Sequence, residues 1–213
     1  MTISMQNNII RKRNDGEPTI LKNGKPEILY SGKIGAVVKL PVLLDKGDGY
    51  IEKDFQQFIR SPGVRVIAVQ DNQILFTKEY RNELNSFDYR LPGGKVFDSF
   101  SEFSSYITDE KDVPLDSILA TAKSELQEES AKDAHVFEHF KKSHSGASID
   151  WDLHYIIARD IFDFTGEVKN EGEQIEAVIW KSFDEVEKMC LDGDIQEDRT
   201  VAALLQFIYK KQY

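Results

Sequence analysis

Three glutamates in residues 122–131 most strongly constrain how this chain can fold. Glu125, Glu128 and Glu129 stand at positions i, i+3 and i+4, and residues with this spacing share one face of an α-helix. Three negative charges this close repel one another and disfavour the helix unless a positive group neutralises them. Carboxylates are hard oxygen ligands that suit Mg²⁺ or Mn²⁺, so the segment predicts either a metal-binding helix or a solvated acidic helix face.

A glycine-containing segment upstream favours the metal-binding interpretation. Residues 91–96 read Leu-Pro-Gly-Gly-Lys-Val, and together with the glutamate helix they resemble the signature of the Nudix hydrolase superfamily, G-x5-E-x7-R-E-U-x-E-E-x-G-U, where U is aliphatic. The match departs from the signature where Asp116 replaces its first glutamate, Ser124 its arginine and Ala131 its second glycine. The resemblance implies an enzyme that hydrolyses a diphosphate bond.

The spacing between the two halves of the signature also differs. Gly94 stands 30 residues before Ser124, where the signature has 14, so sixteen residues are inserted. They lie within residues 98–114, which are rich in serine and acidic side chains without a clean period. This composition indicates an irregular surface loop before the helix. Such an insertion is tolerated because the entropy of loop closure grows slowly with loop length.

The flanking segments extend the resemblance to most of the chain. Hydrophobic alternation and spacing predict two strands joined by an Asp71-Asn72 turn, a late strand and two final helices; their ranges are 64–70, 73–81, 175–180, 183–193 and 199–209. This order resembles the Nudix branch that acts on ADP-ribose and related nucleoside diphosphate sugars. The resemblance implies an α+β fold, in which residues 61–213 form a Nudix α/β/α sandwich with a mixed sheet between helices.

Residues 1–60 are predicted to form a separate small antiparallel β appendage. Asn23-Gly24 and residues 47–49 are hairpin-turn signals next to the extended segments 34–44 and 50–60. Two or three strands are marginally stable alone and must pack on another element. In the resembled branch this small sheet crosses to a second subunit, so the resemblance implies a homodimer.

The resemblance also assigns roles to the acidic residues. It implies that Glu125 and Glu129 are direct ligands of Mg²⁺, with Mn²⁺ also possible, and that the Gly94 carbonyl is another ligand. Glu128 would be a further ligand or a water-mediated partner with a catalytic role.

Substrate contact and proton transfer are assigned in the same way. Arg81, at the end of a predicted strand, would contact the substrate. The general base would come from the loop before the late strand, where Glu173 is slightly preferred over Glu171. The alternative interpretation is that both glutamates simply belong to an acidic surface loop. Arg90, next to Leu91, is a candidate to supply the positive charge that Ser124 lacks.

Composition limits the partners and the compartment. The 213 residues include 27 Lys and Arg against 37 Asp and Glu, a formal charge of −10, which disfavours nonspecific binding to nucleic acid or to an anionic membrane. The single cysteine, Cys190, excludes an intramolecular disulfide and fits a reducing compartment. With no signal-like or membrane-spanning apolar run, we expect a cytoplasmic protein whose partner is a small nucleotide sugar.

Two functional classes follow from these patterns. The first is a Mg²⁺-dependent pyrophosphatase that cleaves a nucleoside diphosphate sugar such as ADP-ribose. The second is a catalytically weakened Nudix-fold module that binds a nucleotide as a sensor or regulator. Retention of all three helix glutamates favours the enzyme, whereas the missing arginine and the insertion favour the sensor. The identity of the base and of the sugar depends on pocket shape, which these patterns leave open.

Overall fold

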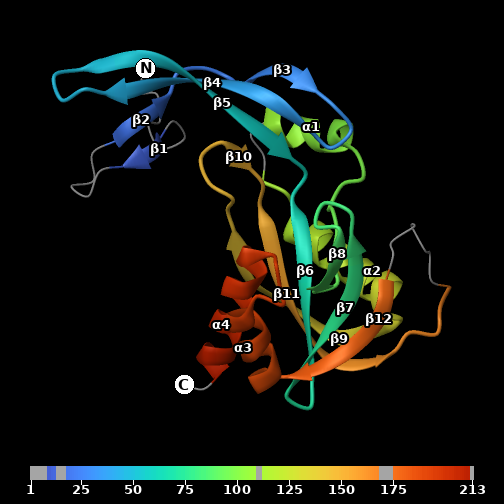
Figure 1. Cartoon of the computed structure of the whole chain (residues 1–213). Coiled ribbons are helices and arrows are strands. Elements are labelled where there is room, and N and C mark those ends of the chain that lie inside the picture. Colours follow the sequence, from blue (N-terminus) through green and yellow to red (C-terminus); the bar gives the residue numbers. More distant parts are fainter. Residues whose placement is uncertain (1–8, 13–17, 109–111, 168–174, 212–213) are drawn as a thin grey trace. The chain divides into compact units, whose positions relative to one another are not determined.

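The chain forms two compact units in the computed structural model, which describes residues 9–12, 18–108, 112–167 and 175–211 (Figure 1). The first unit comprises residues 1–61, 97–112 and 145–151, and the second comprises 62–96, 113–144 and 152–213. The first unit therefore contains two segments from later in the chain in addition to the predicted appendage.

A mixed six-stranded sheet is the centre of the second unit. Its strands follow the order β12-β7-β6-β11-β9, with β8 paired to β7; they are β6 (Gly63–Gln70), β7 (Gln73–Arg81), β8 (Ser86–Arg90), β9 (Lys132–Ser143), β11 (Leu153–Asp163) and β12 (Ile175–Ser182). β11 runs parallel to β6 and antiparallel to β9. The two strands predicted from residues 64–81 and the late strand are confirmed.

The predicted turn between β6 and β7 has the geometry that a tight hairpin requires. Asp71 and Asn72 both have positive φ, 50° and 61°. A two-residue turn of this kind matches the twist of the strands, and Asp and Asn tolerate its left-handed backbone better than most residues. The turn therefore sets the register of β7, which carries Arg81 at its end.

Helices cover both faces of this sheet (Figure 1). α2 (Leu115–Ser130) buries Ile118, Ala122 and Leu126 against alternate residues of β6 and β11. α3 (Phe183–Asp192) and α4 (Asp198–Lys211) lie on the opposite face, as their apolar spacing predicts. Ala131 caps the C-terminus of α2 with φ 52°, a left-handed conformation at the position where the signature has a glycine. The result is the predicted α/β/α arrangement.

The first unit is built on a second six-stranded sheet. Its strands follow the order β1-β2-β4-β5-β10, with β3 paired to β4; they are β1 (Ile9–Lys12), β2 (Pro18–Lys22), β3 (Glu27–Ser31), β4 (Gly35–Asp45), β5 (Tyr50–Arg60) and β10 (Ile149–Asp150). The hairpin between β4 and β5 is as predicted. Asn23 and Gly24 do not join a hairpin, because the strands on either side of them both pair with β4.

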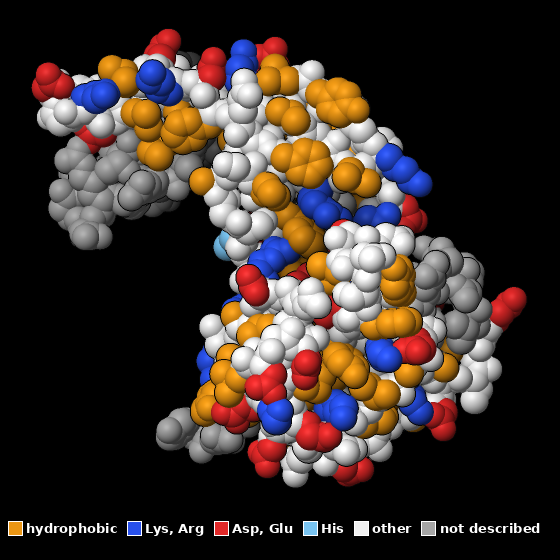
Figure 2. Space-filling view, viewed as in Figure 1, with side chains coloured by type: hydrophobic (Ala, Val, Ile, Leu, Met, Phe, Trp, Pro, Cys, Tyr) orange, Lys and Arg blue, Asp and Glu red, His pale blue; other side chains and the backbone are white. Residues whose placement is uncertain are grey.

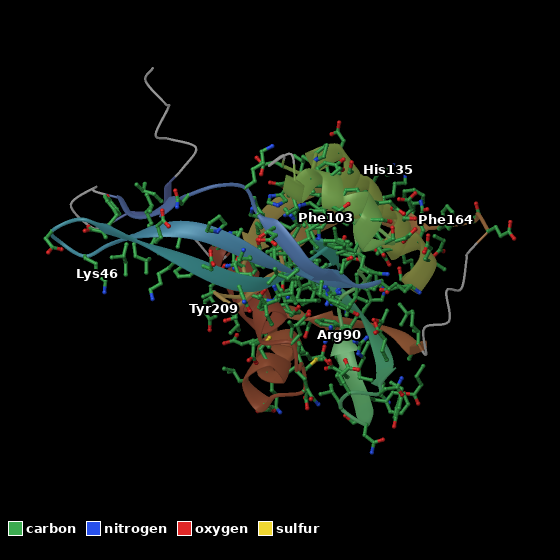
Figure 3. The ribbon with its side chains drawn as sticks, turned by 90° about the horizontal axis from the view of Figure 1, so that it is seen from above. Lys46, Arg90, Phe103, His135, Phe164 and Tyr209 are labelled. Atoms are coloured by element: carbon green, nitrogen blue, oxygen red, sulfur yellow. The ribbon has the colours of Figure 1, made fainter. Side chains whose placement is uncertain are left out.

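The prediction of an irregular surface loop at residues 98–114 is wrong. Residues 100–108 form the helix α1 (Phe100–Thr108), and Phe100 is 5% exposed in a core with Ala36, Val38 and Ile59. Phe103, labelled in Figure 3, also packs against this core. The spacing of Phe100, Phe103 and Ile107 is helical, but the intervening serines obscure it. The insertion therefore contributes Phe100, Phe103 and Ile107 to the core of the first unit.

None of the helices within the described ranges combines the length and the apolar character needed to cross a membrane.

Candidate functional site

The Gly93–Gly94 loop lies against β6 with almost no space for side chains. The Val64 amide donates to the Gly94 carbonyl at 2.9 Å, and the Val66 amide donates to the Pro92 carbonyl at 2.7 Å. A Cβ on Gly93 would stand 2.1 Å from the Val64 carbonyl oxygen, and a Cβ on Gly94 would stand 2.1 Å from Glu125 Oε1. Both positions therefore require glycine for steric reasons, and the second glycine is what lets a carboxylate approach the loop.

Glu125 and Glu129 of α2 converge on this loop. Glu129 is 6% exposed, and its Oε2 accepts a hydrogen bond from the Gly93 amide at 2.9 Å. Glu125 Oε1 lies beside the Gly94 Cα, as the close approach above requires. The two residues are one helical turn apart, so α2 presents two carboxylates to adjacent residues of the loop. The structure therefore brings together Glu125, Glu129 and Gly94, three of the predicted site residues.

Glu128 has a different partner from its two neighbours. The hydroxyl of Ser124, one turn earlier on α2, donates to Glu128 Oε1 at 2.7 Å in an exposed position. The residue that replaces the signature arginine therefore contacts a signature glutamate, although through a neutral hydroxyl. Lys123, the adjacent cation, forms an ion pair with Asp133 at 3.3 Å, and Asp116 is exposed in the first turn of α2.

Arg65 of β6 supports the loop from the other side. Its Nη1 donates to the Gly93 carbonyl and to the Val64 carbonyl, both at 3.1 Å. Its Nε and Nη2 donate to the two oxygens of Glu197 at 3.0 and 3.2 Å. Arg65 is 8% exposed, so this guanidinium is a buried brace that links the loop to the start of α4. Burial alone would lower the pKa of Arg65, but the charge and hydrogen bonding of Glu197, with the charge of Glu129, raise it.

Arg90 and Asp88 of β8 extend this buried ion network. Arg90, labelled in Figure 3, donates to Asp88 Oδ2 at 3.0 Å and to Glu197 Oε1 at 3.2 Å. Burial alone would raise the pKa of Glu197, but the charges of Arg65 and Arg90, with hydrogen bonds from Arg65 and Thr200, lower it to about 2. Glu197 therefore stays ionised between two arginines. Arg90 therefore pairs with Asp88 and Glu197, and not with a glutamate of α2 as a replacement for the signature arginine would.

Neither Arg65 nor Glu197 was among the residues predicted for the site. Arg65 carries a signal that could have found it, because it is the one charged residue in the apolar run at positions 64–69. A charge inside such a strand must find a partner when the strand is buried. Glu197 carries no comparable signal, since it lies in a polar connection between two helices.

Arg81, the predicted substrate-contacting residue, ends β7 with two acidic neighbours. Its guanidinium pairs with Glu83 Oε1 at 2.7 Å and with Glu79 Oε2 at 3.5 Å. Glu79 is 8% exposed and accepts a hydrogen bond from the Thr77 hydroxyl at 2.5 Å. The Arg81 side chain is 35% exposed, so its charge remains accessible at the end of the strand.

The two candidate general bases, Glu171 and Glu173, lie outside the described residues. Within the part of the chain that the structure describes, no three His, Cys, Asp or Glu side chains are grouped as a metal cluster. The loop nevertheless fits a divalent cation in its donor chemistry. Two carboxylates meet two adjacent glycines, which have no Cβ to obstruct them. Magnesium is commonly held by one or two carboxylates, with water and substrate phosphates completing its shell.

Comparison with known proteins gives a likeness in structure only. No protein-family model matches the sequence, and no curated protein matches it. Among solved structures, the chain is similar to an ADP compounds hydrolase with a TM-score of 0.59 and 18% sequence identity, over 89% of this chain and 94% of that one. This likeness agrees with the predicted fold class, an α+β fold of mixed sheet and helices.

Proposed function

We propose that this protein hydrolyses the diphosphate bond of a nucleoside diphosphate sugar such as ADP-ribose, with Mg²⁺ as cofactor and Mn²⁺ as a possible replacement. The observation that carries the proposal is the convergence of the Glu125 and Glu129 carboxylates on the Gly93–Gly94 loop. The fold of an ADP compounds hydrolase supports the same reaction class. A carboxylate buried beside a loop that can accept no side chain is a costly arrangement for a purely structural helix.

Glu125, Glu129 and the Gly94 carbonyl would hold the cation. The Gly94 carbonyl already accepts the Val64 amide, but a carbonyl oxygen has a second lone pair. Glu128 would act as a further or water-mediated ligand, positioned by the Ser124 hydroxyl. When bound, the cation would shield the diphosphate charge and lower the pKa of a coordinated water.

The chain's own residues would supply binding and proton transfer. Arg81 would exchange part of its pairing with Glu79 and Glu83 for a phosphate oxygen of the substrate, because a guanidinium suits phosphate geometry. The buried brace from Glu197 through Arg65 would keep the Gly93 backbone fixed while Glu129 accepts its amide. Glu173, or else Glu171, would accept the proton from the attacking water.

The proposal is tested by incubating the protein with ADP-ribose and Mg²⁺ and measuring the AMP and ribose 5-phosphate that are released. We expect Glu129→Gln and Glu128→Gln to abolish turnover, because a neutral amide is a poor ligand for a hard cation. Glu138→Gln, at an exposed position on β9 of the same unit, is the matched control and should retain activity. Full activity of Glu129→Gln, or of the wild type in excess chelator, would refute the proposal.

The base and the sugar are to be identified with a panel of nucleoside diphosphate sugars, dinucleotides and nucleoside triphosphates. The expected result is cleavage confined to compounds that contain a diphosphate bridge. Calorimetric titration of Mg²⁺, with and without nucleotide, separates cation binding from turnover.

A nucleotide-binding sensor is the second candidate, and Ser124 is the observation that favours it. The family resemblance places an arginine at this position to orient the catalytic glutamates, and Ser124 offers Glu128 only a hydroxyl. A sensor would bind nucleotide and Mg²⁺ without releasing product. The wild-type turnover assay above distinguishes the two candidates directly.

We also propose a homodimer formed through the first unit. β3 and the turn after it expose hydrophobic side chains, with Tyr30 68% and Ile34 61% exposed, and Figure 2 shows hydrophobic side chains at the surface of this unit. An apolar group of this kind is typical of an interaction surface. Light scattering at micromolar concentration should give twice the chain mass, and Tyr30→Ser together with Ile34→Ser should shift it to the monomer.

A further inference from the structure

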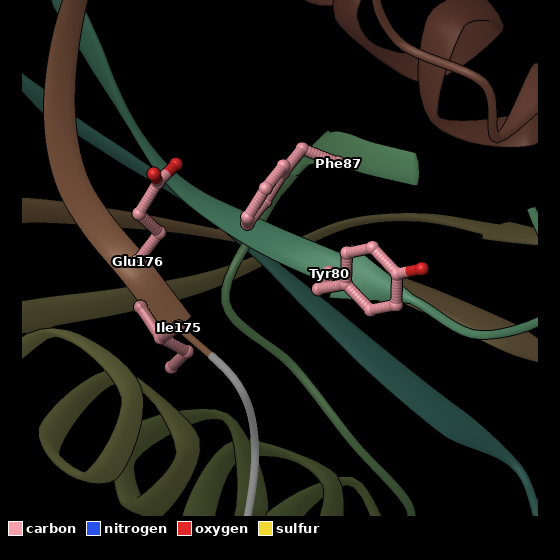
Figure 4. A pocket seen from close by; sticks show the side chains of 4 residues that line it. All are labelled: Tyr80, Phe87, Ile175 and Glu176. Atoms are coloured by element: carbon pink, nitrogen blue, oxygen red, sulfur yellow. The ribbon is translucent and has the colours of Figure 1, made fainter. Parts of the chain in front are cut away.

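The second unit has an open hollow beside the ends of three strands, and none of the residues that line it belongs to the Gly93–Gly94 loop or to α2. Its volume is about 460 Å³, and it is lined by Tyr80 of β7, Phe87 of β8 and Ile175 and Glu176 of β12 (Figure 4). Ligand sites commonly have volumes of roughly 300–1,000 Å³ with mostly apolar walls and a few polar groups. None of these four residues has a role in the function proposed above.

Two aromatic rings form one side of the hollow. The ring centroids of Tyr80 and Phe87 are 5.4 Å apart with an interplanar angle of 78°, and Phe87 is 44% exposed. The Tyr80 hydroxyl is occupied, because it donates to Asn85 Oδ1 at 2.7 Å. What the pair offers a ligand is therefore π surface, which suits a flat ring stacked on one aromatic group and edge-on to the other.

An acidic and a basic side chain form an ion pair next to these rings. Glu176 is the one acidic residue of the lining, and it pairs with Lys78 Nζ at 2.5 Å. Lys78 Nζ also lies 4.7 Å from the centroid of the Phe87 ring. The lining of the hollow thus includes a hydrogen-bond acceptor, Glu176, whose ion-pair partner Lys78 places a donor beside the same aromatic wall. A nucleobase edge presents the complementary pair, an N–H donor next to a nitrogen or carbonyl acceptor.

The hollow is on the opposite side of β7 from Arg81. Side chains alternate along a strand, so Lys78 and Tyr80 point to one side and Glu79 and Arg81 to the other. Lys78 is already paired, so the hollow offers no uncompensated cation for a phosphate. Its chemistry suits the base of a nucleotide rather than its phosphates.

We propose that this hollow is a binding subsite for a purine base. A purine is favoured over a pyrimidine because its two fused rings provide more stacking surface for Tyr80 and Phe87. The assignment rests on the proposed function in one respect, namely that the ligand is a nucleotide. The base belongs either to the substrate or to a second nucleotide bound alongside it.

Calorimetric titrations of AMP and GMP, with ribose 5-phosphate as a probe that lacks the base, test this subsite. Phe87→Ala should weaken binding of at least one of the two nucleotides by about tenfold or more, because stacking on an aromatic side chain contributes substantially to each bound base. Its binding of ribose 5-phosphate should be unchanged. Phe162→Ala, which removes a phenylalanine of β11 that is 39% exposed, is the matched control and should bind as the wild type does.

Binding of AMP and GMP within twofold of the wild type in Phe87→Ala, or no binding of either by the wild type, would overturn the subsite. If the base belongs to the substrate, Phe87→Ala raises KM for ADP-ribose. If it belongs to a second nucleotide, KM is unchanged while AMP or GMP binding is still lost. ADP-ribose hydrolysis together with AMP and GMP binding that does not depend on Phe87 would refute the subsite alone, whereas Phe87-dependent AMP binding without hydrolysis would refute the proposed function alone.

Discussion

Replacing Glu197 with glutamine tests the buried ion network behind the glycine loop. Glu197 is 13% exposed and accepts hydrogen bonds from Arg65 and Arg90. Glutamine keeps the shape of the side chain but removes the charge, so both guanidiniums lose their shared carboxylate in a poorly hydrated position. Losing one partner of a buried ion pair typically destabilises a protein by about 3–5 kcal/mol.

The pKa of Glu197 gives an independent magnitude. Its ordinary value is 4.5 and the folded value is about 2, a difference that corresponds to about 3 kcal/mol of stability at pH 7. Because the folded pKa is the lower one, this stabilisation is fully present above pH 4.5 and is lost as the pH falls toward 2. At pH 3 about half of it should remain. The stability difference between wild type and Glu197→Gln should therefore narrow from about 3 kcal/mol at pH 7 to about 1.5 kcal/mol at pH 3.

Urea unfolding followed by Trp180 fluorescence measures this difference in the second unit. A Trp151→Phe background leaves Trp180 as the sole tryptophan, because the chain has two, and Trp180 packs against the core under α2. Glu138→Gln in the same background controls for loss of an exposed glutamate and should change stability by less than about 0.5 kcal/mol. A difference below about 1 kcal/mol at pH 7, or one that does not narrow by pH 3, would refute the reasoning.

Three further predictions concern the glycine loop, the inserted helix and the cysteine. Gly94→Ala should raise the Mg²⁺ concentration needed for half-maximal activity by about tenfold or more, because its Cβ would stand 2.1 Å from Glu125 Oε1; Gly32→Ala, whose nearest neighbour would be 3.6 Å away, is the control. Phe100→Ala should destabilise the first unit by about 3–5 kcal/mol, measured by urea unfolding with Trp151 fluorescence, and an unchanged midpoint would exclude α1 from that core. Cys190 is 8% exposed and burial raises the pKa of its thiol to about 11, so at pH 8 iodoacetamide should modify it about 100-fold more slowly than in urea; equal rates would contradict its burial.

The local parts of the fold were accessible from the sequence. The Asp71-Asn72 turn, the strands on either side of it and the helical face that carries Glu125 and Glu129 each depend on neighbours a few residues away. The same is true of α3, whose capping box at Ser182 and Glu185 and terminal Gly193 define its two ends. Turn chemistry, capping and hydrophobic period are all short-range signals, and for that reason these elements could be predicted.

The inserted residues were misjudged because their signal depends on a distant partner. The serines between Phe100, Phe103 and Ile107 make α1 look like a polar loop, and the helix becomes plausible only with the apolar face of β4 and β5 to pack on. The stability of a short helix comes mainly from such packing rather than from its own propensity.

The candidate site divides in the same way. Sequence by itself determined which carboxylates share a helix face and that a double glycine precedes them, since spacing along the chain decides both. Only the tertiary structure decided that Glu129 accepts the Gly93 amide, that Arg65 braces the same residue through Glu197, and that Tyr80 and Phe87 border a hollow with Glu176. These contacts join residues far apart in the chain, and a buried charge or ring acquires its partner only when the sheet and helices have packed.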